Sequence, residues 1–322
     1  MCLASIVSAL EDADTSSQSY FECFKLNGST YRIIEHDAFG ETPFIYVKIN
    51  LASVVLIDTG CGPRAVTDPR AQHSWLRRFI EAHPVPENGD APLNPGGHKP
   101  YIVICTHCHF DHIGGIADFG DLDTTQIWAS GHDRGFLSPK HLPSSSLCND
   151  MGVDTPVYSV THWADDGQTV SDGDGTKLPL SIYQIPGHTP DQLAVWDWEE
   201  RHLFVGDMAY LDAAILFLRG GSIIKYWQSL TKLRRLVDEW DSQSGQSAKL
   251  SCGHQTSGHA ASAMLADIEQ VLQQICQGKI PAANQGNKYG MHDLQLYAPE
   301  GSRISFLGPR ETFDEMFVTG SE

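Results

Sequence analysis

The sequence has few basic residues for its length. It contains 22 lysines and arginines against 40 aspartates and glutamates in 322 residues, which gives a net charge of −18. A protein that binds nucleic acid through its phosphates needs a surface rich in lysine and arginine. This charge therefore argues against nucleic acid as a partner, and we expect a small-molecule substrate instead.

Long apolar runs are also absent. No stretch of about 18 apolar residues occurs, so we expect neither a membrane span nor a membrane partner. The first ten residues are mildly apolar, but they lack the basic residues that begin a secretory signal, and acidic residues follow at once. A cytoplasmic protein is the expectation.

Cysteines are too scattered for a disulfide scaffold. The 8 cysteines are spread from Cys2 to Cys276, whereas disulfide-stabilised domains are small and dense in cysteine. Reduced thiols are expected instead. With 41% hydrophobic and 19% charged residues, the composition fits a folded globular protein. We expect a flexible N-terminal segment over residues 1–20 and a single domain over residues 21–322.

Mixed strand and helix patterns indicate an α/β fold. Short runs rich in valine, isoleucine and aromatic residues predict β-strands at 44–50, 53–58, 101–105, 126–129, 181–185, 192–198, 202–205 and 248–252. Apolar residues recur at helical spacing from Tyr226 to Trp240 and from Met264 to Ile275, and 74–83 predicts a third helix. Residues 84–100, rich in proline, glycine and asparagine, predict a surface loop.

The segment 105–115 concentrates residues that bind metals. A predicted strand runs into a turn that carries His107, His109, Asp111 and His112. Imidazole and carboxylate are ligands that zinc and its neighbours in the transition series take. The spacing of the first two histidines lets both rings face one ion, and the next two residues follow where the chain bends and can face a second ion. We interpret the segment as a metal-binding motif, because such a pattern is rare by chance.

Two cysteines in this segment offer a different kind of site. Cys105 and Cys108 have the C-x-x-C spacing of structural zinc sites, but no second C-x-x-C follows to complete four sulfur ligands. The first ends an apolar strand, and the second points away from the two histidines in an extended turn. We interpret both as small buried residues.

Further predicted strands end in a polar residue beside a glycine. His188, Asp207 and His254 lie in such positions, where the sheet fixes the side chain and the glycine lets the backbone approach an ion. Each is a weak signal alone, but together they add two imidazoles and a carboxylate. Asp58 ends another strand, and two interpretations of it stay open: a turn residue, or an acid that orients a ligand histidine.

The whole series resembles, in order, the motif set of the metallo-β-lactamase-fold hydrolases: Asp58, His107-x-His109-x-Asp111-His112, His188, Asp207 and His254. The resemblance covers roughly residues 44–278 and implies a four-layer αββα sandwich with the metal site at one edge, between the two sheets. It implies that a first ion is held by His107, His109 and His188. It implies that a second is held by Asp111, His112 and His254, that Asp207 bridges the two, and that Asp58 is the structural acid of the fold. Among the histidines outside the motifs, the following are predicted not to bind metal: His132, His141, His162, His259 and His292.

The resemblance implies a hydrolase with two divalent ions, zinc in the first place, with manganese, iron or cobalt as alternatives. Two ions about 3.5–4 Å apart lower the pKa of a shared water, so that a hydroxide between them attacks the substrate carbonyl. Asp111, next to that hydroxide, could accept and return the proton. A binding protein that had lost catalysis would lack ligands, and none is missing here.

Tyr210 bears on the substrate, which the fold alone does not fix. It lies three residues after Asp207 and so resembles a tyrosine of the quorum-signal lactonases that assists the substrate carbonyl. A phenol there could donate a hydrogen bond to a developing oxyanion, and simple packing is the alternative. The prediction is a lactonase or lactamase that opens a small cyclic ester or amide. A glyoxalase-II-like thioesterase is the first alternative, although the residues after Asp207 differ from that family's, and an iron-dependent persulfide dioxygenase is the second.

Overall fold

The computed structural model describes residues 20–62, 75–121, 124–288 and 290–318, and it falls into two compact units. The first unit comprises the chain up to Cys105 with 110–128 and 156–162, and the second comprises 106–109, 129–155 and the chain from Trp163 onward. The predicted flexible segment 1–20 lies outside the described residues except for Tyr20. The single domain over 21–322 stays a prediction. Among the described residues, no helix is long and apolar enough to cross a membrane.

A seven-stranded sheet organises the first unit, with its strands in the order of the sequence. They are β1 (Phe21–Lys25), β2 (Thr30–Glu35), β3 (Phe44–Ile49), β4 (Val54–Ile57), β5 (Tyr101–Ile104), β6 (Thr125–Ser130) and β7 (His162–Ala164). The strands β1 to β4 pair antiparallel, and β4, β5 and β6 pair parallel. Every residue of β4 and β5 is buried, as is usual for central parallel strands. Both strands therefore end in the core, next to Asp58 and Cys105.

The helices of the first unit are short. They are α1 (Leu76–Ala82), which lies within the predicted helix at 74–83, and α2 (Phe110–Ile113). Single 3-10 turns occur at Pro86–Asn88, Pro95–Gly97 and Ile116–Phe119. Two of these turns interrupt the segment that the sequence predicts as a loop, 84–100.

Two sheets build the second unit. The six-stranded sheet has the order β14-β13-β11-β10-β9-β8, with β8 (Gln168–Ser171), β9 (Lys177–Gln184), β10 (Leu193–Asp197), β11 (His202–Phe204), β13 (Lys249–Ser251) and β14 (His259–Ala260). The four-stranded sheet has the order β12-β17-β16-β15, with β12 (Ala214–Leu216), β15 (Ala283–Lys288), β16 (Met291–Tyr297) and β17 (Ser305–Pro309). Three short helices belong to this unit as well: α3 (Leu142–Ser145), α4 (Cys148–Met151) and α7 (Arg310–Val318). The sequence analysis did not predict the four-stranded sheet.

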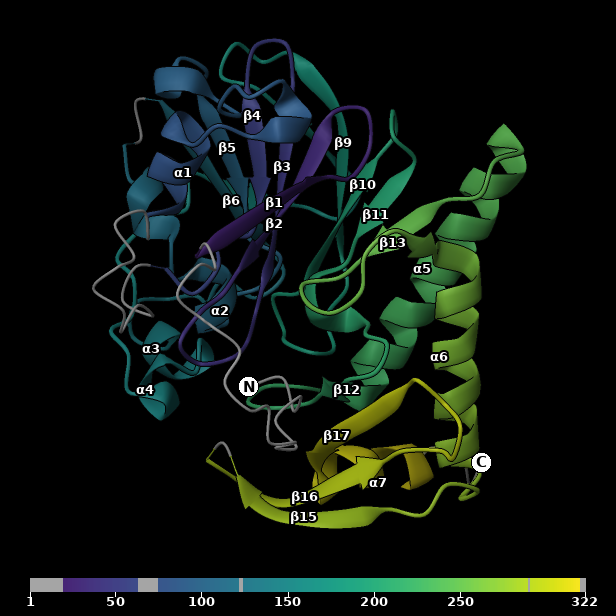
Figure 1. The fold of residues 1–322 in the computed structure, drawn as a ribbon. Helices are drawn as coiled ribbons and strands as arrows, with labels where there is room; N and C mark the ends of the chain where they lie inside the picture. Colours follow the sequence, from purple (N-terminus) through teal and green to yellow (C-terminus); the bar gives the residue numbers. More distant parts are fainter. Residues whose placement is uncertain (1–19, 63–74, 122–123, 289, 319–322) are drawn as a thin grey trace, which may run out of the picture. The chain divides into compact units, whose positions relative to one another are not determined.

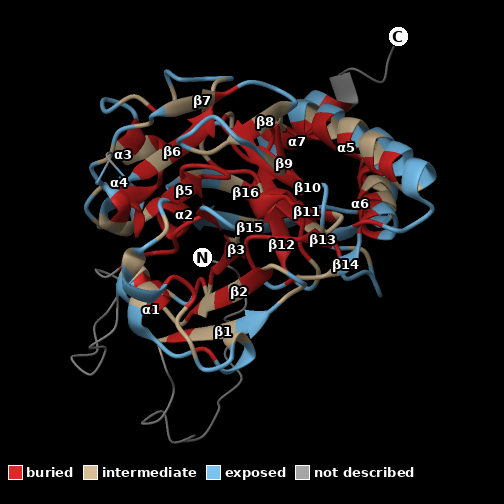
Figure 2. Ribbon diagram, turned by 90° about the horizontal axis from the view of Figure 1, so that it is seen from above, coloured by how far each residue is buried: buried red, intermediate tan, exposed pale blue. Residues whose placement is uncertain are grey.

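Two long helices of the second unit, α5 (Ile223–Ser244) and α6 (Ala261–Cys276), lie side by side (Figure 1). The side chain of Ser222 caps the start of α5, and Gly245 ends it with a left-handed φ of 67°. The predicted apolar positions are buried in both helices: Tyr226, Leu230, Leu233, Val237, Trp240, Met264, Ile268, Val271 and Ile275. Figure 2 shows the opposite sides of both helices exposed. The indole rings of Trp240 and Trp196 in β10 stack at 4.1 Å, which packs α5 against the six-stranded sheet.

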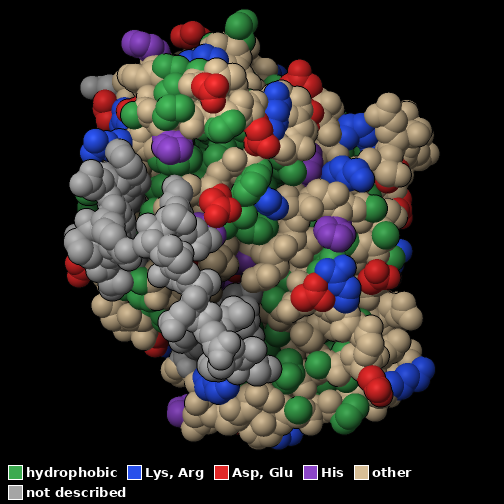
Figure 3. Space-filling model, viewed as in Figure 1, with side chains coloured by type: hydrophobic (Ala, Val, Ile, Leu, Met, Phe, Trp, Pro, Cys, Tyr) green, Lys and Arg blue, Asp and Glu red, His purple; other side chains and the backbone are tan. Residues whose placement is uncertain are grey.

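Charged side chains are scattered over the face of the molecule that Figure 3 shows. Acidic and basic groups alternate there, and the described part of that face carries no continuous basic patch. That nucleic acid is not a partner stays a prediction.

A carboxyl group is buried in the first unit where β2 ends. Glu35 is fully buried and accepts hydrogen bonds from the Tyr20 hydroxyl and the Cys61 N–H, both at 2.7 Å. Gly60 passes so close that a Cβ there would lie 1.8 Å from Oε2 of the carboxyl group. Burial raises the pKa of Glu35 to about 8, against hydrogen bonds that lower it.

Replacing this group, in Glu35→Gln, should remove a pH-dependent part of the stability. Because burial raises the folded pKa, the stabilisation by the neutral carboxyl is complete below the usual value of 4.5 and is lost as the pH rises through about 8. The free energy of unfolding of the wild type should fall in this range by on the order of 1 kcal/mol per pH unit relative to the variant. Thermal unfolding of both proteins between pH 5 and 8 measures this, and parallel curves would contradict it.

Candidate metal centre

A short loop of the second unit, 106–109, carries the first two predicted ligands. The Thr106 carbonyl accepts a hydrogen bond from the Leu193 N–H at 2.7 Å, which ties the loop to β10. The Thr106 hydroxyl lies 3.1 Å from Nδ1 of His107. This contact fixes the ring, so that Nε2 of His107 faces the neighbouring histidines.

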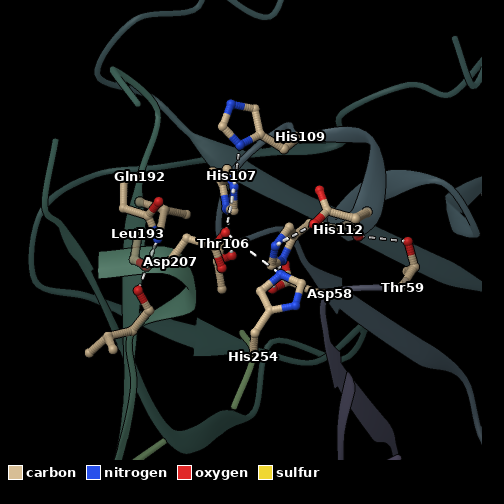
Figure 4. A network of polar contacts seen from close by, with 12 residues as sticks. Asp58, Thr59, Thr106, His107, His109, His112, Gln192, Leu193, Asp207 and His254 are labelled. Carbon is tan, nitrogen blue, oxygen red and sulfur yellow. Dashed lines mark hydrogen bonds and ion pairs between the residues drawn. The ribbon is translucent and has the colours of Figure 1, made fainter. Parts of the chain in front are cut away.

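Three imidazoles and a carboxylate converge in this unit. Nδ1 of His109 lies 3.0 Å from Nε2 of His107 (Figure 4). The same Nδ1 lies 3.1 Å from Nε2 of His188. Oδ2 of Asp207 lies 3.8 Å from both of these Nε2 atoms. All four side chains are buried. Nδ1 of His188 donates to the Leu216 carbonyl at 2.7 Å, so its Nε2 carries a lone pair that faces the group.

This donor set fits a divalent transition metal. A neutral imidazole carries one proton on its two nitrogens, so His109 cannot donate to both neighbours through the same nitrogen. A cation among the four side chains would relieve the repulsion between lone pairs. In a tetrahedral zinc site with bonds of about 2.0–2.1 Å, two ligand nitrogens lie about 3.3 Å apart. The four ligand atoms here lie within 4.8 Å of one another, a spacing that one ion can span.

The remaining predicted ligands divide between the two units. In the second unit, Nε2 of His254 lies 3.7 Å from Oδ2 of Asp207. In the first unit, Asp111 and His112 are neighbours in α2, with Oδ2 and Nε2 3.8 Å apart. All of these side chains are buried. The histidine and aspartate clusters of the chain are consistent with a dinuclear site for divalent ions.

Asp58 contacts the predicted ligand that lies in its own unit. Its Oδ2 lies 2.8 Å from Nδ1 of His112, and both the N–H and the hydroxyl of Thr59 donate to the His112 carbonyl at 2.7 and 2.9 Å. The backbone of Asp58 has a φ of 65°, which is uncommon outside glycine. Since Nδ1 of the histidine faces this carboxylate, Nε2 is left for an ion. The contact favours the interpretation of Asp58 as an orienting acid over a simple turn residue.

The sequence does not point to Asp191, which contacts Cys108 in the loop 106–109. Its buried carboxyl group accepts hydrogen bonds from the backbone and the thiol of Cys108. Burial raises the pKa of Asp191 to about 7, although these hydrogen bonds lower it. The only signal in the sequence is an acid three residues after His188, which is too common a pattern to single out.

The other residues that the sequence singled out lie as follows. Tyr210 is 3% exposed, and its ring centroid lies 5.9 Å from that of His254. Cys105 and Cys108 are buried, and the seven cysteines among the described residues form no disulfide. The histidines predicted not to bind metal lie outside the clusters, four of them exposed and His162 partly buried.

Comparison with known proteins places this site in a family. A family model described as the metallo-beta-lactamase superfamily matches residues 44–240. The chain belongs to the metallo-β-lactamase superfamily. The resemblance found in the motifs and the α/β sandwich class that it implied are thereby confirmed. Members of this superfamily are generally metal-dependent hydrolases.

The individual proteins that are similar to this chain carry different names. A protein of Aspergillus versicolor named "Putative transcription factor avaE" is 33% identical over 84% of this chain and 81% of its own length. "Acyl-coenzyme A thioesterase MBLAC2" of Gallus gallus is 27% identical over 57% of this chain and 64% of its own length. The solved structure of VMB-1 has a TM-score of 0.50 at 17% identity, over 78% of this chain and 95% of that one, and it shows the fold alone.

Gly187 should tolerate no side chain, because it lies against α5. A Cβ there would lie 2.5 Å from Cα of Tyr226, and the neighbouring His188 would have to move with it. We expect Gly187→Ala to lower the free energy of unfolding by about 1–3 kcal/mol, as overpacking does. Gly173→Ala is the matched control, since that position has open space around it. Denaturant unfolding of both variants measures the difference, and equal midpoints would contradict this packing role.

Proposed function

We propose that the chain is a dinuclear metal-dependent hydrolase and that its substrate is a thioester. The observation that carries the hydrolase is the convergence of His107, His109 and His188 on Asp207 within one unit. The named activity of the thioesterase relative supports the choice of substrate, as that protein matches this chain over 57% of its residues. The thioesterase, which is the first alternative from the sequence, is therefore placed ahead of the lactonase or lactamase.

In the proposal, His107, His109 and His188 would hold the first ion, Asp111, His112 and His254 would hold the second, and Asp207 would be a ligand of both. Zinc is the proposed metal, because imidazole and carboxylate ligands suit it. When bound, the two ions supply an activated water and polarise the substrate carbonyl.

The protein itself transfers the proton and keeps the ligand histidines in orientation. Asp111 accepts the proton of the attacking water and returns it to the leaving group. Asp58 keeps His112 in the orientation and tautomer that expose Nε2. The Leu216 carbonyl does the same for His188. Because these groups are fixed before the substrate binds, little reorganisation is needed during the reaction.

A second candidate, opening of a lactone or lactam ring, rests on Tyr210. Its ring lies 5.9 Å from that of His254, so its phenol is near the proposed site. A phenol that donates to the substrate carbonyl only as negative charge develops would assist ring opening. The thioester and the ring substrates can be separated by direct measurement.

Metal content and substrate choice test the proposal together. Elemental analysis should find about two divalent ions per chain in the loaded protein, and thioesters should be cleaved faster than lactones and lactams. His109→Ala should lose metal and activity, whereas His259→Ala, the control at an exposed position, should keep both. A protein that holds one tight ion at any metal concentration would overturn the proposal and favour the persulfide dioxygenase.

The Tyr210→Phe variant tests the second candidate. The variant keeps the ring but removes the hydroxyl, so only a transition-state interaction is lost. If rings are substrates, we expect kcat for a lactone to fall roughly tenfold to hundredfold, because metal ions share the load with the phenol. KM and metal content should stay the same. An unchanged kcat would leave packing as the role of Tyr210 and remove the support for ring substrates.

A further inference from the structure

The loop that carries His254 is closed at its base by one buried hydroxyl group. Ser251 is the last residue of β13 and is fully buried. Its Oγ accepts a hydrogen bond from the Gly258 N–H at 3.0 Å and lies 3.1 Å from the Ser257 hydroxyl. The same Oγ lies 2.7 Å from Nε2 of His202 in β11. One side chain therefore joins both ends of the loop to the neighbouring strand.

The directions of these hydrogen bonds depend on the protonation state and the tautomer of His202. Its imidazole is buried and stacks on the Phe204 ring at a centroid distance of 4.7 Å. Burial lowers its pKa to about 4, so the ring is neutral at neutral pH. In the tautomer that carries its proton on Nδ1, Nε2 accepts the hydroxyl proton of Ser251, whose two lone pairs then receive the N–H of Gly258 and the hydroxyl of Ser257. The hydroxyl then donates one hydrogen bond and accepts two, which is all that it can form.

The rest of the loop is tied to the segment that carries Asp207. The Gly253 N–H donates to the Gly206 carbonyl at 2.8 Å. The Thr256 hydroxyl accepts from the Leu211 N–H at 2.9 Å. A shift of the loop base would therefore change the position of His254 relative to Asp207. The other histidines near Asp207 are carried by separate segments, the loop 106–109 and the turn after β9.

We infer that Ser251 and His202 are positioning residues for His254, and that they set the affinity of the second metal ion without changing that of the first. This inference rests on the proposed function, in which His254 is a ligand of the second ion only. Neither side chain is part of the proposed ligand set. Replacing a residue that orients a metal ligand typically weakens metal binding 10- to 100-fold.

Titration of the metal-free protein with Zn²⁺, followed by calorimetry and by competition with a chelator, tests the inference. The binding step that disappears in His254→Ala identifies the second ion. In Ser251→Ala we expect this step to be weakened about 10- to 100-fold, with the other step unchanged. Ser181→Ala is the matched control: it removes another buried serine of the same sheet, which accepts a hydrogen bond from the Trp198 indole at 2.9 Å. It should lower the unfolding temperature but leave both binding steps unchanged.

Two variants of His202 test the same inference without relying on the folding of Ser251→Ala. His202→Phe keeps a ring against Phe204 but offers no acceptor, so it should weaken the same step. His202→Gln restores an acceptor and should recover most of the affinity. Unchanged titrations in Ser251→Ala and His202→Phe, or equal weakening of both steps, would overturn the inference alone. A wild type that binds no second ion would overturn the proposed function and this inference with it.

Discussion

The rest of the structure depends on holding several imidazoles and carboxylates together in a buried place. A buried polar group that lacks a partner costs free energy on the scale of a lost hydrogen bond or more. The protein meets part of this cost by giving one nitrogen of three of the rings a protein partner: Thr106 for His107, Leu216 for His188 and Asp58 for His112. These partners decide where the protons lie. In the second unit, the remaining nitrogens of His107 and His188 face His109, an arrangement that a cation can satisfy and that protons alone cannot.

This demand also explains where the backbone is constrained. Asp207 must stand close to the loop 106–109, and the residue before it is Gly206, with a φ of 51° and no room for a Cβ beside the Thr106 hydroxyl. The turn before His188 has the same need, since Gly187 packs against Tyr226, whose hydroxyl donates to the Met208 carbonyl at 2.6 Å. Helix α5 thus supports two ligand segments at once. The buried face of α5 and the two glycines, Gly187 and Gly206, therefore all help to hold the ligand segments in place.

Part of this arrangement could be predicted from sequence because it is local. The helical spacing from Tyr226 to Trp240 marks one buried face, and ligands at strand ends follow runs of apolar residues that any strand pattern reveals. The four-stranded sheet could not be predicted in this way, since β15 is polar and largely exposed and is held by its pairing with β16. Asp191, His202 and Ser251 escaped for a related reason. They are polar residues whose partners belong to other segments of the chain. No periodicity in the sequence distinguishes them from surface residues.

The choice between a thioester and a ring substrate turns on the leaving group. A thiol with a pKa near the model value for cysteine, about 8.5, leaves readily as an anion. An alkoxide or an amide nitrogen is far more basic and needs a proton as the bond breaks. For a thioester, Asp111 would matter mainly as the acceptor of the proton from water. For a lactam, the return of the proton by Asp111 becomes essential. The same buried side chains would thus serve both reactions. The basicity of the departing atom decides which of these side chains acts in the rate-limiting step.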